Sequence, residues 1–122
     1  MLIEFLKPDF EFIDSRGSLV QLIREGYKQV NVIHSKANVI RGQHFHKLNS
    51  ELFYVVSGEF VLTVNEVGRQ TSEVYTMNAG KLFLIPPNIV HSFKFTVDTC
   101  LVSMYDKGVE IEGGAKDIHA VL

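Results

Sequence analysis

The sequence predicts an all-β protein whose strands are mostly antiparallel and form a sandwich or a barrel. Nearly every candidate element is a short run of Val, Ile, Leu, Phe or Tyr bounded by Gly, Asn, Asp or Pro, which is the pattern of strands. Tight-turn signals separate several of these runs, and helical periodicity is almost absent. Many short strands separated by turns in one small chain are typical of sandwiches and barrels.

The predicted strands follow one another with short connections. Ser57-Gly58 and the segments 65–68 and 78–80 are hairpin turns, because Gly and Asn adopt the left-handed backbone that tight turns need. Successive strands joined by such turns are antiparallel. The predicted strands are residues 2–6, 18–23, 29–34, 39–46, 51–57, 59–65, 73–77, 82–85, 91–95 and 100–105.

Proline and glycine delimit the last third of the chain. The proline pair at 86–87 lacks backbone donors and ends the strand before it, so residues 88–90 form a turn that leads His91 into the next strand. The segment 107–116 contains three glycines and two glutamates and is expected to be a loop or a mobile end. A weak signal indicates a helical turn over 116–120.

Length and charge restrict the classes of protein. The 122 residues give room for one domain, residues 1–122, which excludes a two-domain enzyme with its own nucleotide-binding fold. A net charge of −2 without a basic run argues against a nucleic-acid partner. No segment approaches the roughly 20 apolar residues of a membrane span. The single cysteine, Cys100, cannot form an internal disulfide and no secretory signal is recognisable, so a cytoplasmic protein is predicted.

Three histidines and one carboxylate form the most informative pattern. Side chains on a strand alternate with a period of two, so His44 and His46 point to the same face with their Cα atoms about 6 to 7 Å apart. Glu51 opens the returning strand after a polar turn, and His91 enters from a separate hairpin. Such donors suit a divalent first-row metal such as Zn, Fe, Mn or Ni. We therefore predict a metal site at His44, His46, Glu51 and His91.

The spacing of these residues resembles the first of the two cupin motifs. That motif runs Gly, five residues, His-x-His, three or four residues, Glu, six residues, Gly. His44, His46, Glu51 and Gly58 fall in this spacing, and Asn38 stands at the place of the first glycine. The resemblance supports the metal-ligand set.

The second cupin motif runs Gly, five residues, Pro-x-Gly, two residues, His, three residues, Asn. Gly80, Pro86 and His91 fit it, while Asn88 replaces the second glycine and Phe95 the terminal Asn. Asn tolerates the left-handed turn that Gly would provide, so the first replacement is lenient. Together the two motifs imply a single cupin (jelly-roll) β-barrel.

A finer resemblance points to cupins that modify nucleotide-linked sugars. Residues 14–19 and 40–46 are similar to deoxysugar 3,5-epimerases, nucleotide-sugar 3,4-ketoisomerases and the cupin half of capsular-polysaccharide reductase/epimerases. The ketoisomerases share Arg-Gly-x-His-x-His-Lys but usually lack the carboxylate of Glu51, which the capsular cupin half carries. The resemblance implies an isomerase of cell-surface polysaccharide biosynthesis, either an epimerase or a ketoisomerase, that acts on a 4-keto-6-deoxy nucleotide sugar without a nucleotide cofactor.

Both reactions begin with removal of a proton beside the sugar carbonyl. His44 matches the position of the family's base, and histidine needs little tuning for that role at neutral pH. Tyr105 matches the acid that returns a proton, although an ordinary strand-end tyrosine is an equal alternative. Lys47 and Arg41, or the metal, are expected to stabilise the enediolate. A metal on His44 would compete with its role as base.

The diphosphate of the substrate requires forked donors. Arg16, Arg24 and Arg41 are the candidates for this substrate-binding role in a slightly acidic chain. A turn salt bridge with Asp14 is the alternative for Arg16. The strand-like N-terminal runs, and the resemblance, imply a homodimer.

Two other classes of function stay open. A metal-dependent cupin oxidoreductase or dioxygenase would use the same three histidines and glutamate, but it leaves the Asp-x-Arg-Gly and Arg-Gly-x-His segments unexplained. A non-catalytic sugar-binding cupin would bind in the same pocket without chemistry.

Overall fold

The computed structural model describes residues 1–121 and consists of strands with one short 3-10 turn. The elements are β1 (Glu4–Leu6), β2 (Phe10–Asp14), β3 (Gly17–Gln21), β4 (Gln29–Ser35), β5 (Ile40–Phe45), β6 (Glu51–Ser57), β7 (Glu59–Glu66), β8 (Ser72–Asn78), β9 (Leu82–Ile85), β10 (Ile89–Phe95), β11 (Thr99–Tyr105), η1 (Glu112–Gly114) and β12 (His119–Ala120). The strand pairs are antiparallel. The predicted all-β class is confirmed.

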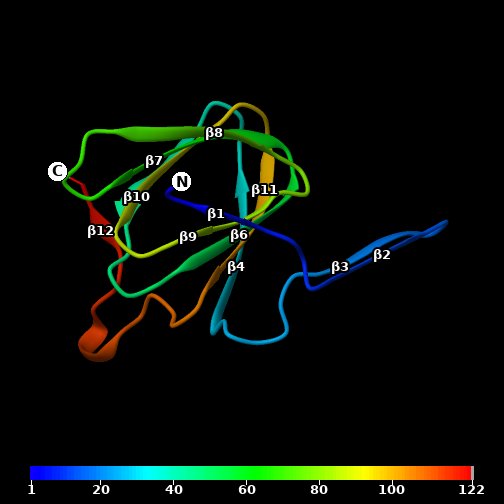
Figure 1. Ribbon diagram of the computed structural model, residues 1–122, viewed down its shortest axis with the longest axis horizontal. Coiled ribbons are helices and arrows are strands. Elements are labelled where there is room, and N and C mark those ends of the chain that lie inside the picture. Colours follow the sequence, from blue (N-terminus) through cyan, green and yellow to red (C-terminus); the bar gives the residue numbers. More distant parts are fainter. Residues whose placement is uncertain (122) are drawn as a thin grey trace.

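Two five-stranded sheets enclose the core, as Figure 1 shows. One sheet has the order β1-β9-β6-β11-β4, and the other has the order β12-β5-β10-β7-β8. Apart from the β7–β8 hairpin, neighbours in these sheets are not consecutive in sequence, which is the crossing connectivity of a jelly roll. The predicted cupin barrel is confirmed. Within residues 1–121, none of the helical structure is long and apolar enough to cross a membrane.

The core lies between the two sheets. Phe53 and Phe83 from the first sheet stack with ring centroids 5.2 Å apart, and Phe60 and Phe93 from the second pack at 5.1 Å. Phe60 and Phe83 are fully buried. Each such ring contributes roughly 1.5–3 kcal/mol by leaving water. The alternation of buried and exposed residues along β7 follows from the period of two that the sequence shows.

Four local expectations need correction. Of the three predicted hairpin turns, only 65–68 joins paired strands, β7 and β8, whereas Ser57-Gly58 and 78–80 connect strands of different sheets. The segment 10–14, which was not expected to be a strand, forms β2 as half of a hairpin with β3. The turn before His91 is shorter than 88–90, because Ile89 already pairs in β10. The helical turn over 116–120 is wrong: the end of the chain pairs with β5 as β12, and the only helical turn described in residues 1–121 is η1. Pairing across the sheet outweighs the weak local helix preference.

The β2–β3 hairpin projects away from the barrel (Figure 1). It forms a separate two-stranded sheet in which Phe12 is the register partner of Leu19. Both side chains are about half exposed, and so is Phe10, which lies on the same face by strand alternation. The hairpin therefore presents an apolar face outside the barrel.

Candidate functional site

An irregularity in β5 aims the candidate site residues at one cavity. His44 pairs with His91 and Gly42 pairs with Ser92, so Gln43 is an extra residue in the ladder and forms a bulge. Gln43 has φ 61° and Gly42 has φ 102°. A Cβ on Gly42 would lie 2.6 Å from the carbonyl oxygen of His91. Glycine at this position therefore lets β5 approach β10 closely where the two histidines meet.

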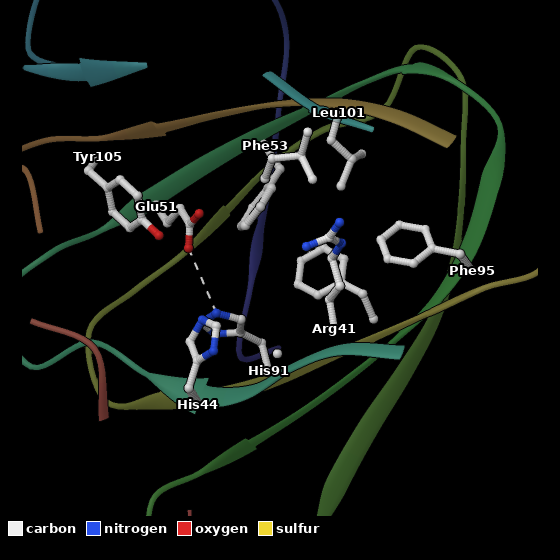
Figure 2. A pocket seen from close by; sticks show the side chains of 11 residues that line it. Arg41, His44, Glu51, Phe53, His91, Phe95, Leu101 and Tyr105 are labelled. Atoms are coloured by element: carbon white, nitrogen blue, oxygen red, sulfur yellow. Dashed lines mark ion pairs between the residues drawn. The ribbon is translucent and has the colours of Figure 1, made fainter. Parts of the chain in front are cut away.

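A cavity of about 310 Å³ opens between the sheets at this place. Figure 2 shows His44 and His91 side by side with the carboxylate of Glu51 facing them, and Arg41 beside Phe95. The cavity wall is polar at the histidines, Glu51 and Tyr105, and the rest is apolar except for Arg41. The lining residues are Ile33, Arg41, Gly42, His44, Glu51, Phe53, His91, Phe93, Phe95, Leu101 and Tyr105.

The three predicted histidines lie together beside the cavity, which His44 and His91 line and His46 does not. Ring nitrogens of His44, His46 and His91 all lie within 4.8 Å of one another. The carboxylate oxygen Oε1 of Glu51 is 3.1 Å from Nε2 of His46 and 3.7 Å from Nε2 of His91. The structure therefore brings together all four residues that the sequence predicts as metal ligands.

Backbone carbonyls hold two of the imidazole rings. Nδ1 of His46 donates to the carbonyl of Asp117 at 2.6 Å, and Nδ1 of His91 donates to the carbonyl of Ile89 at 3.1 Å. Each ring consequently turns Nε2 toward Glu51. Nε2 of His91 is buried and has no hydrogen-bond partner within residues 1–121. An orphaned, oriented imidazole nitrogen is typical of a ligand position.

The histidines differ in their affinity for protons. Burial lowers the pKa of His91 to about 4, and burial together with the nearby His46 lowers the pKa of His44. Burial acts in the same direction on His46, but its hydrogen bonds to Glu51 and Asp117 outweigh that effect and raise its pKa. At neutral pH His44 and His91 are therefore neutral imidazoles.

Tyr105 reaches the same cluster from β11. Its ring meets the ring of His46 edge-on, with centroids 5.0 Å apart. Burial, followed by the nearby charge of Glu51, raises the pKa of the Tyr105 phenol. The hydroxyl therefore keeps its proton at neutral pH.

Comparison with known families agrees with this architecture. Residues 12–107 match the family described as the polysaccharide biosynthesis C-terminal domain. The chain belongs to this family. No curated protein matches the sequence significantly.

Solved structures share the fold of this polysaccharide biosynthesis C-terminal domain. A 3,4-ketoisomerase from Helicobacter canadensis has a TM-score of 0.76 at 24% identity, with 87% of this chain and 84% of that chain covered. A variant of the 3,4-ketoisomerase QdtA from Thermoanaerobacterium thermosaccharolyticum, solved with TDP-4-keto-6-deoxyglucose, has a TM-score of 0.72 at 16% identity (86% and 80%). The dTDP-4-dehydrorhamnose 3,5-epimerase from Bacillus anthracis has a TM-score of 0.71 at 23% identity, with 85% of this chain and 71% of that chain covered. These neighbours confirm the cupin fold.

The predicted arginines of this family member are separated in space. Arg41 lines the cavity, where its Nε donates to the hydroxyl of Ser35 at 2.8 Å. Arg16 lies at the tip of the β2–β3 hairpin and bonds to Asp14, which is the turn salt bridge that the sequence left as the alternative. Arg24 is exposed and 3.5 Å from a carboxylate oxygen of Asp9. Neither Arg16 nor Arg24 lines the cavity of its own chain.

The predicted cation Lys47 is also outside the cavity. Its side chain is exposed, and its backbone N–H donates to the buried carboxylate of Asp117. Asp117 and its partner Asn49 were missed by the sequence reasoning, which expected a loop or a mobile end up to residue 116 and no role for Asp117. No local pattern could have indicated this role, because the contacts of Asp117 join residues about 70 positions apart.

The positions where the chain departs from the cupin motifs keep the motif backbone. Asn38 and Asn88 stand where the motifs have glycine, and their φ angles are 68° and 65°. Both are left-handed, so Asn supplies the conformation expected of it. Phe95, in place of the terminal Asn, is buried and lines the apolar end of the cavity.

Proposed function

We propose that the chain is a nucleotide-sugar epimerase or 3,4-ketoisomerase that acts on a 4-keto-6-deoxy nucleotide sugar. The observation that carries the proposal is that three groups line one cavity: the neutral imidazole of His44, the protonated phenol of Tyr105 and the guanidinium of Arg41. Membership of a polysaccharide biosynthesis family and a fold shared with epimerases and ketoisomerases support it.

His44 is the proposed base. Its lowered pKa leaves the ring nitrogen unprotonated at neutral pH, and the ring is half-buried at the cavity wall. It can therefore accept the proton from the carbon beside the sugar carbonyl. His46, with its raised pKa, lies next to it and places positive charge near the oxygen of the resulting enediolate.

Tyr105 is the proposed acid. Return of a proton to the opposite face of the same carbon inverts that carbon, whereas protonation of the former carbonyl carbon moves the ketone. Tyr105 and His44 come from strands of opposite sheets, so the two groups can address different faces of a ring held between them. The identity of the product distinguishes an epimerase from a ketoisomerase.

Arg41 is the proposed binding group for the substrate's anionic or carbonyl oxygen. Its bonds to Ser35 and to the carbonyl of His34 fix the guanidinium at the cavity and leave further N–H donors for a ligand. The cavity volume is at the lower end of ligand pockets, which span roughly 300–1,000 Å³. We therefore place the sugar ring inside the cavity and the nucleotide outside it.

We also propose that His44, His46, Glu51 and His91 hold a divalent metal ion, Zn, Fe, Mn or Ni. The partnerless Nε2 of His91 and the carbonyl-held rings of His46 and His91 fit such an ion. A bound ion supplies positive charge close to the enediolate oxygen. His44 acts as base, and His46 as a cation, only while their nitrogens are not metal ligands. Metal content and a metal-induced rise in Tm test the site, and both should be lost in His91→Ala. Activity measured after removal of the metal with a chelator decides whether His44 acts as a ligand or as the base.

A homodimer is the proposed assembly. β4 is an edge strand of its sheet, with Val30 and Val32 more than half exposed, and the β2–β3 hairpin carries further exposed apolar side chains. In a dimer, the hairpin of one copy can bring Arg16 to the cavity of the other. In gel filtration, Val32→Lys is expected to shift the elution volume to that of a monomer, whereas Val74→Lys, at an equally exposed position on β8, leaves it unchanged.

A cytoplasmic location remains a prediction.

Deuterium exchange tests the proposed reaction. The protein is incubated in deuterated water with a panel of 4-keto-6-deoxy nucleotide sugars, and proton NMR follows deuterium entering beside the carbonyl. We expect exchange that is lost in His44→Asn and retained in the control His34→Asn, which changes an exposed histidine outside the cavity. If no deuterium enters the sugar but oxygen is consumed when iron is added, the oxidoreductase is favoured. If the sugar binds saturably and no deuterium enters, a sugar-binding cupin is favoured.

A further inference from the structure

The end of the chain lies across the candidate site although it falls outside the residues that match the family. The match ends at residue 107, whereas β12 pairs Ala120 with His44 and His119 with Phe45. Between these two regions, Asp117 is buried with an exposed fraction of 1%. A buried carboxylate needs several donors to remain ionised.

The carboxylate of Asp117 binds the loop that joins the two ligand-bearing strands. Its Oδ1 accepts the backbone N–H of Lys47 at 2.8 Å, and its Oδ2 accepts those of Leu48 and Asn49 at 2.9 and 3.0 Å. The side-chain amide of Asn49 adds a bond of 2.9 Å, and Nε2 of His119 is 3.0 Å from Oδ1. This loop lies between His46 and Glu51, so one side chain holds the segment that connects them.

The backbone of the same residue sets the orientation of His46. The carbonyl oxygen of Asp117 accepts the Nδ1–H of His46 at 2.6 Å, which directs Nε2 toward Oε1 of Glu51 at 3.1 Å. The carboxylate keeps Asp117 against the loop, and the backbone N–H of Asp117 adds a bond of 2.7 Å to the carbonyl of Val109. Burial by itself would raise the pKa of Asp117, but the bonds from Asn49 and the loop N–H groups outweigh it and lower the pKa, so the carboxylate stays charged.

We propose that Asp117 is a positioning residue, which through its carboxylate holds the 47–49 loop and through its carbonyl fixes His46 with Nδ1 protonated and Nε2 facing Glu51. Neither this side chain nor His46 lines the cavity, so the effect on substrate is exerted through His46 on its partner Glu51, which does line it. The placement of His46 is independent of the reaction. Any effect on turnover rests on the proposed function.

NMR of the full chain tests the placement without substrate. The Nδ1–H proton of His46, identified by its absence in His46→Gln, is expected to exchange slowly with water in the wild type. In Asp117→Ala it should exchange about tenfold faster or disappear, because a buried charge-assisted set of bonds is lost. Asp117→Asn retains the size and one acceptor oxygen and should recover most of the protection. Asp98→Ala, which removes a carboxylate that binds a backbone N–H elsewhere, is the control and should leave the signal unchanged.

Unaltered exchange of the His46 proton in folded Asp117→Ala would overturn the proposal, as would an equal loss in Asp98→Ala. If Asp117→Ala does not fold, the comparison is made with Asp117→Asn, in which exchange must still be measurably faster than in the wild type. With a reacting sugar, kcat is expected to fall in Asp117→Ala with little change in KM and to be partly restored in Asp117→Asn. A chain that shows the NMR effect but reacts with no sugar refutes the proposed function and leaves the positioning role standing.

Discussion

The neutral state of His91 predicts a loss of stability in mild acid. His91 is almost completely buried, and burial lowers its pKa from the usual 6.5 to about 4. The unfolded chain therefore binds a proton at a pH where the folded chain does not. For such a depressed pKa, the stabilisation is fully present above 6.5 and is lost as the pH falls toward 4. Linkage between these two values gives a loss of about 2.5 kcal/mol of unfolding free energy by about pH 4.5.

Between pH 6.5 and pH 4, the other groups with shifted pKa values either leave the stability unchanged or lower it further as the pH falls. The raised pKa of His46 contributes stability that is complete below the usual value of 6.5, so it does not change as the pH falls further. The pKa values of Asp14 and Asp117 are lowered from 3.8, so their contributions are lost mainly below the window. His44, with its lowered pKa, adds to the loss from His91.

Urea unfolding of the wild type and of His91→Asn measures the effect. Both proteins are compared at about pH 7.5 and about pH 4.5 with a chelator present, so that release of a metal does not contribute. We expect the pH-dependent loss to be smaller by about 2.5 kcal/mol in His91→Asn, whatever the stability of that variant at neutral pH. His91→Gln serves if the Asn variant does not fold. An equal loss in the wild type and the variant would refute the assignment of His91 as a neutral buried imidazole.

Three further predictions concern packing and catalysis. Gly58→Ala should cost about 3 kcal/mol of unfolding free energy, because a Cβ there would lie 2.6 Å from the carbonyl oxygen of Asp98. The control Gly26→Ala has a similar positive φ but open space around the Cβ and should cost about 1 kcal/mol. Equal losses in the two variants would contradict the clash at Gly58. Phe83→Ala should cost about 3–5 kcal/mol in urea unfolding, and a smaller loss would mean that the core collapses around the gap. Tyr105→Phe should lower kcat by about 10²–10⁴ while deuterium exchange beside the carbonyl persists; full turnover would exclude Tyr105 as the acid.

Local sequence patterns could predict the cluster because its geometry is mostly local. His44 and His46 share a side by the alternation of the strand, and Glu51 follows after one short turn. His91 is farther along the chain, yet the proline pair before it ends the preceding strand and so places His91 near the start of the next one. The resulting fold class and the four clustered residues agree with the structure.

The rest of the site depends on features that periodicity does not show. On a regular strand Arg41 and His44 would face opposite sides, and the bulge at Gln43 brings both to the cavity. A glycine within a strand was the available signal for that bulge. The role of Asp117 depends on contacts with residues about 70 positions earlier, which no local pattern indicates. The direction of the β2–β3 hairpin, which carries Arg16 away from the cavity, is likewise a tertiary property.

The partner of each ring accounts for the unequal roles that we propose for the histidines. His46 lies between the carbonyl of Asp117 and the carboxylate of Glu51, and both favour its protonated form. His91 is almost completely buried and faces the same carboxylate from 3.7 Å, so desolvation prevails and the ring stays neutral. For His44, burial and then the charge of His46 lower the pKa by more than Glu51 raises it. While no metal is bound, one carboxylate among three imidazoles thus leaves one cation beside one neutral base, and that combination suits the proposed proton abstraction next to a carbonyl.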